Sequence, residues 1–159
     1  MLKRILAALL CISVPVLAHA ASDEPNSYKV MYDGGSLANI KAGTDAKLII
    51  HPTEVLLIKD KVTLVTIPAD KITEISYGQD VHRRIGAAIG LAVISLGIGA
   101  LMAFTKSKKH YIGITWSDGD KKGGFAVQAD KSDYRGQLTA LEGITGKKAV
   151  DSDAMNVKN

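Results

Sequence analysis

The chain has 159 residues, of which 47% are hydrophobic and 23% charged, a composition typical of one folded domain rather than of a disordered chain. Its formal net charge of +4 is too small for a nucleic-acid footprint, so we expect no nucleic-acid partner. The single cysteine, Cys11, lies in the N-terminal segment described next, which leaves the remainder without disulfides or cysteine-bound metals.

The first residues have the three parts of an export signal. Lys3 and Arg4 form a basic start, residues 5–17 are apolar, and residues 18–20 read Ala-His-Ala, which fits an A-x-A cleavage site. We therefore expect residues 1–20 to be a signal peptide and the mature protein to lie on the periplasmic side. Residues 21–27 are polar and predict a short tether.

Short β-rich runs separated by turn residues occupy the next fifty positions. Asp33-Gly34-Gly35 predicts a turn after the first run, because glycine adopts positive φ without strain. Proline in His51-Pro52-Thr53-Glu54 and the pair Asp60-Lys61 predict two further turns. We expect strands over residues 28–32, 46–50, 55–59, 62–67 and 71–77.

Two more strands and a helix are predicted near the C-terminus. Residues 110–116 alternate as a strand does, residues 117–124 predict a loop rich in Asp, Lys and Gly, and residues 125–129 complete a hairpin. Residues 134–144 carry apolar side chains at helical spacing, with N-cap candidates in residues 130–133 and Gly146 as a C-terminal stop. The polar tail, residues 147–159, is expected to be mobile.

This order of elements resembles the bacterial pleckstrin-homology-like and GRAM-like domains, and small exported bacterial proteins without an assigned function. The resemblance is carried by residues 48–58, 67–75, 111–127 and 134–144, and an apolar segment interrupts the family pattern. It implies an α+β fold, mainly antiparallel β, in which a C-terminal helix caps a bent sheet over residues 28–146. It also implies proximity to a membrane, since such domains often bind lipids or peptides, but no site residue.

The apolar segment is residues 85–104, a run of 20 residues without a charge. A helix of this length reaches about 30 Å, the hydrocarbon thickness of a bilayer. Basic side chains at both ends are candidates for contact with lipid phosphates. They are Arg83, Arg84, Lys106, Lys108 and Lys109.

Three arrangements of this segment remain open. A straight transmembrane helix would place the flanking strands on opposite sides of the membrane, where they could not pair. A re-entrant helical hairpin that turns near residues 95–97 would keep them together, and a buried soluble element is the third arrangement. Small residues four apart let helices approach closely. The candidates for such packing are Gly86, Gly90, Ser95, Gly99 and Ala103.

The polar residues suggest no catalytic or metal centre. His82 and His110 flank the apolar segment and would approach each other in the hairpin arrangement, but their spacing suggests no third metal ligand. Asp33, Ser36 and His51 could be named as a triad, yet none lies in a nucleophile-elbow motif. We expect neither a cofactor nor a metal, and no enzymatic activity.

The sequence therefore predicts a non-enzymatic exported module, held at a membrane by residues 85–104 and their basic flanks, that binds a lipid headgroup or a peptide. The alternative is a membrane assembly element whose small-residue helix faces pack together into a homo-oligomer.

Overall fold

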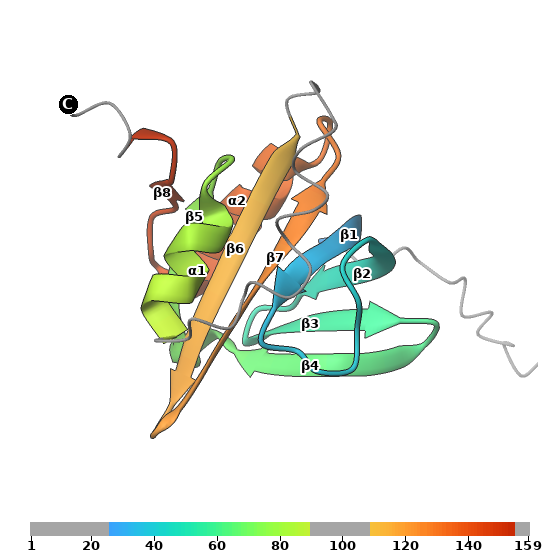
Figure 1. Cartoon of the computed structure of the whole chain (residues 1–159), viewed down its shortest axis with the longest axis horizontal. Coiled ribbons are helices and arrows are strands. Elements are labelled where there is room, and N and C mark those ends of the chain that lie inside the picture. The colour runs from blue at the N-terminus through green and yellow to red at the C-terminus, as the bar shows by residue number, and fades with distance from the viewer. Residues whose placement is uncertain (1–25, 90–108, 155–159) are drawn as a thin grey trace, which may run out of the picture.

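Alternating apolar residues build eight strands that form one sheet in the computed structural model, which describes residues 26–89 and 109–154. The strands lie in the order β4-β3-β2-β1-β7-β6-β5-β8, and all neighbours are antiparallel except β5 and β8. Two α-helices and one 3-10 helix complete the described fold. The prediction of an α+β fold with mainly antiparallel strands and a C-terminal helix is confirmed (Figure 1).

The first four strands are consecutive along the chain and in the sheet. They are β1 (Ser27–Gly35), β2 (Thr44–Ile50), β3 (Glu54–Lys59) and β4 (Val62–Pro68). The turn predicted at Asp33-Gly34-Gly35 is wrong, because β1 continues through these residues and pairs Gly34 and Gly35 with β7. The register shifts between Tyr32 and Gly34, so Asp33 is the extra residue of a β-bulge.

The second group of strands starts after a 3-10 helix, η1 (Ala69–Lys71). It comprises β5 (Ile72–Tyr77), β6 (His110–Asp118), β7 (Lys121–Ala129) and β8 (Val150–Asp151). The loop predicted over residues 117–124 is wrong, because Ser117 pairs with Lys122 and Asp118 with Lys121. The β6–β7 hairpin therefore continues through residues that are mostly polar, where no alternation of apolar and polar side chains predicts a strand.

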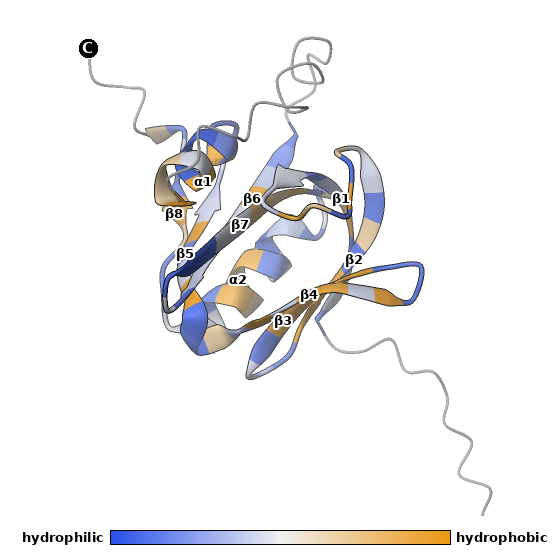
Figure 2. Ribbon diagram, turned by 60° about the horizontal axis from the view of Figure 1, so that its bottom comes forward, coloured by the Kyte–Doolittle hydropathy of each residue, from blue (hydrophilic) through white to orange (hydrophobic). Residues whose placement is uncertain are grey.

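Large apolar side chains fill the inner, concave face of the sheet. Helix α2 (Tyr134–Thr145) lies across this face, and its Leu141 is fully buried among Leu48, Ile114 and Phe125. Figure 2 shows α2 between the two groups of strands, with apolar residues on both. Gly146 ends α2 in the left-handed conformation at φ 67°, as predicted. The predicted N-cap is only partly right: Asp133 occupies the position but its side chain forms no capping hydrogen bond.

Helix α1 (Val81–Ile89) lies on the opposite, outer face, over β6 and β7 (Figure 1). The tail was predicted to be mobile from residue 147, but the structure describes it through residue 154. Val150 and Asp151 form β8, which pairs in parallel with Ser76 and Tyr77 of β5. The N-terminal signal, most of the tether and residues 90–108 lie outside the described residues.

Candidate functional site

The chain leaves the sheet and returns to it at one place, which we call the insertion base (residues 78–84 and 109–111). The backbone N–H of Gly78 donates to the carbonyl oxygen of Tyr111 at 3.1 Å, and the side-chain amide of Gln79 donates to the carbonyl oxygen of Lys109. Strands β5 and β6 are paired from Tyr77 and Ile112 onward. Both ends of the long connection are therefore held at the same end of the sheet.

Helix α1 is positioned by an apolar stripe and by glycines beneath it. Val81, Ile85 and Ile89 recur at intervals of four and are buried. A Cβ atom at Gly113 would lie 2.4 Å from Val81 Cγ1, and one at Gly124 would lie 2.8 Å from Ile85 Cγ2. These strand glycines are needed because the helix approaches the sheet closely. The apolar run thus begins as part of a helix packed on the protein itself.

The basic flanks have different environments. Arg83 is exposed on α1, whereas the guanidinium of Arg84 donates to both carboxylate oxygens of Glu74 on β5, at 2.9 and 2.8 Å. These hydrogen bonds, together with the charge of Glu74, raise the pKa of Arg84 despite its partial desolvation. Arg84 therefore fastens α1 to the sheet. Lys109 is half-buried at the return to β6, and Lys106 and Lys108 lie outside the described residues.

A buried hydrogen-bonded pair joins the start of α1 to the bulge in β1. His82 Nε2 lies 2.5 Å from Asp33 Oδ2, and the two side chains are only 10% and 12% exposed. The ring of Tyr111 approaches His82 edge-on at 5.7 Å between centroids. Burial, and then the charge of Asp33, raise the pKa of the Tyr111 hydroxyl.

The two histidines that flank the apolar run have separate partners. The ring of His110 stacks on Tyr134 of α2, with centroids 4.0 Å apart, whereas His82 is occupied by Asp33. Ser36 is also occupied, since its hydroxyl donates to the carbonyl oxygen of Gly124 at 3.2 Å. Residues 26–89 and 109–154 contain no group of three His, Cys, Asp or Glu side chains arranged for a metal ion.

A C-terminal strap, residues 149–153, closes the insertion base and was not predicted from the sequence. Ser152 donates through its backbone N–H and its hydroxyl to the carbonyl oxygen of Tyr77, at 2.8 Å each. The carboxylate of Asp153 accepts from the backbone N–H of Gln79 at 2.6 Å and of Asp80 at 3.2 Å. Gly78 has φ 120°, and a Cβ there would meet Ser152 Oγ at 2.4 Å. Gly78 is the one sequence feature that could have indicated the strap, because a residue without a side chain permits both the positive φ and the close approach of Ser152.

Of the small residues predicted to pack helices, only Gly86 is described, and it is half-buried on α1. Gly90, Ser95, Gly99 and Ala103 fall in the part of the chain that is not described. None of the helices within the described ranges combines the length and apolarity that a membrane span requires.

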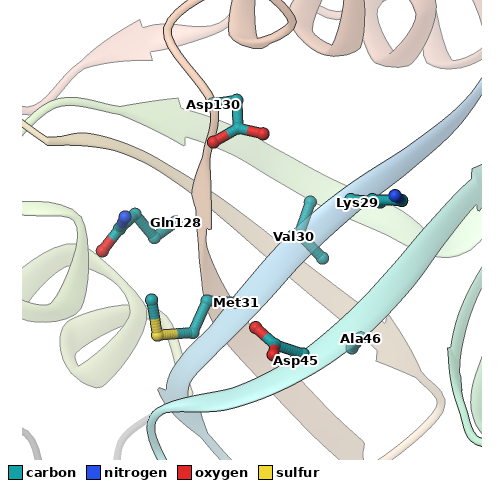
Figure 3. A pocket seen from close by; sticks show the side chains of 7 residues that line it. All are labelled: Lys29, Val30, Met31, Asp45, Ala46, Gln128 and Asp130. Atoms are coloured by element: carbon teal, nitrogen blue, oxygen red, sulfur yellow. The ribbon is translucent and has the colours of Figure 1, made fainter.

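A separate hollow of about 360 Å³ lies on β1, β2 and the end of β7 (Figure 3). Its lining includes Lys29, Asp45, Gln128 and Asp130. Figure 3 shows the Lys29 and Gln128 side chains pointing away from each other. These polar groups do not converge, so we place the candidate site at the insertion base instead.

No protein-family model matches the chain, and no curated protein resembles it to a significant degree.

Proposed function

We propose that this protein is a non-enzymatic, exported binding module held at a membrane through its insertion base. The observation that carries the proposal is the closure of the base: β5 and β6 pair on either side of the connection that contains the apolar run. The strand order and the C-terminal helix packed on the inner face support a pleckstrin-homology-like arrangement.

The closed base favours an apolar segment that enters and leaves the lipid on one side. A single straight crossing would separate β5 from β6 and break the hydrogen bond between Gly78 and Tyr111. Ile85 and Ile89 are already buried against the sheet, at 1% and 8% exposure. Fewer apolar residues than the ~20 needed for a full helical span therefore remain for the lipid. A shallow or re-entrant insertion agrees best with both facts.

Two cations of the base are suited to contact lipid phosphates. Arg83 is exposed on α1, and Lys109 stands where the chain returns to the sheet. Each basic side chain near an anionic surface contributes about 1 kcal/mol to binding. Arg84 is left out of this group of phosphate contacts, because its guanidinium is paired with Glu74.

Flotation with lipid vesicles tests the proposal. The full chain should float with vesicles rich in anionic lipid. The double variant Arg83→Gln/Lys109→Gln should bind these vesicles about thirtyfold more weakly than the parent at low salt, and the difference should shrink at high salt. The matched control is Lys121→Gln/Lys122→Gln, which removes two exposed cations from the hairpin at the other end of β6 and β7. A parent chain that stays in solution with every vesicle composition contradicts the proposal.

An assembly element is the second candidate, because α1 exposes the small side chains of Ala87 and Ala88, which permit close helix packing. Crosslinking in membranes should then yield oligomers that disappear in the Gly90→Leu/Gly99→Leu variant. Unchanged oligomers with intact vesicle binding would favour the headgroup-binding module alone.

A further inference from the structure

A hollow of about 350 Å³ lies at the insertion base, beside the C-terminal strap. Segments distant in the chain line it: the end of β5, the start of β6, the start of α2 and the strap. This volume is within the range of ligand sites in proteins. The side chains that matter for its chemistry are Tyr77, Lys109, Tyr134, Asp151 and Asp153.

One wall of the hollow carries two carboxylates. Asp151 Oδ2 accepts a hydrogen bond from the Tyr77 hydroxyl at 3.3 Å, and Asp153 Oδ1 accepts from backbone N–H groups. Asp151 Oδ1 also accepts from the backbone N–H of Asp153 at 2.9 Å, and neither carboxylate forms an ion pair with a lysine or arginine of the described residues. The pKa of Tyr77 is raised, first by burial and then by the charge of Asp151, in agreement with a negative field here.

The other side of the hollow supplies rings and a cation. Tyr134 stacks on His110 with an angle of 5° between the ring planes, and the guanidinium of Arg135 lies 5.7 Å from the Tyr134 centroid. The Tyr134 ring therefore already has both an aromatic and a cationic neighbour. Lys109 lines the same hollow. Two aspartates and one lysine thus line a single small volume.

We propose that this hollow binds a phosphoethanolamine group, with its primary ammonium at Asp151 and Asp153 and its phosphate at Lys109. A primary ammonium has N–H donors for carboxylate oxygens, whereas a quaternary ammonium has none and needs open ring faces. This inference rests on the proposed function only for the source of the group: at a membrane, the source is a lipid headgroup, and in solution it is a free phosphoethanolamine.

Titration of the full chain with soluble phosphoethanolamine tests the site, with the backbone amide signals of Tyr77 and Asp151 as the readout in NMR. These signals should shift saturably, while inorganic phosphate and phosphocholine should bind more weakly. Asp151→Asn keeps the shape of the side chain and removes its charge, so it should weaken binding about tenfold. The matched control, Asp120→Asn, lies at the exposed tip between β6 and β7 and should bind as the parent does.

Equal binding of phosphocholine or of phosphate alone would overturn the assignment, as would unchanged affinity in Asp151→Asn with an otherwise unchanged spectrum. Vesicles then separate this inference from the proposed function. A parent chain that binds soluble phosphoethanolamine but floats with no vesicle supports the hollow and refutes membrane anchoring. A different result supports anchoring and refutes the hollow as a site. In that case flotation is the same with and without ethanolamine lipid, Asp151→Asn floats as the parent does, and soluble phosphoethanolamine does not bind.

Discussion

The two faces of the sheet bury their helices in different ways. The inner face meets α2 with large side chains, among them Tyr32, Leu57 and Phe125, each at most 2% exposed. The outer face meets α1 over Gly113, Gly124 and other small residues, and adds polar pairs that involve His82 and Arg84. The inner face therefore supplies the stability of the domain, and the outer face determines where one particular helix lies.

Leu141→Ala should have the largest effect, because Leu141 is fully buried where α2 meets the inner face. The lost contacts and the cavity should lower the free energy of unfolding by about 2–5 kcal/mol. Urea denaturation followed by circular dichroism measures this change. A loss below that of Ile85→Ala on the outer face would contradict the division between the faces.

Gly113→Val should have a smaller effect on the whole domain and a local effect on α1. The added side chain would overlap Val81 and Ile85, so α1 should be displaced at a cost of about 1–3 kcal/mol. Hydrogen exchange should then be faster in residues 81–89 and unchanged in α2. The control is Gly143→Ala on α2, where a Cβ meets nothing within 4 Å. Faster exchange in α2 would show that the helices are not independent.

Tyr32→Phe should have the smallest effect near neutral pH and a clear one in alkali. Burial on the inner face raises the pKa of Tyr32 from 10.0 to about 12. The neutral hydroxyl favours the folded state, so its contribution is complete below pH 10 and is lost as the pH rises toward 12. Denaturant midpoints measured across this window should fall less steeply in the variant. Equal slopes would place the alkaline transition elsewhere, for example at Tyr111 on the outer face.

Sequence patterns predicted the inner face better than the outer face. Alternation located most strands, and the helical spacing of residues 134–144 with Gly146 located α2, since each signal is local. The Asp33-Gly34-Gly35 segment predicts a turn, but glycine also occurs at β-bulges, and in the structure this segment is part of a bulged strand. Strand β8 has two residues, too few to show any periodicity.

The candidate site was predictable only in part, since its contacts join residues far apart in the chain. Asp33 and His82 are separated by 49 residues, and Asp153 lies 74 residues from Gln79. The position of the basic flanks beside an apolar run was evident from the sequence. The use of Arg84 to hold α1 depended on Glu74 facing the outer side of the sheet, a detail that only the fold determines.

The strap also imposes an order on biosynthesis. Ser152 donates to the carbonyl oxygen of Tyr77, 75 residues earlier, so the bonds of the strap cannot form until residue 152 has been synthesised. The apolar run, residues 85–104, is translated well before the strap. The apolar run can therefore make its own contacts before the strap closes the insertion base.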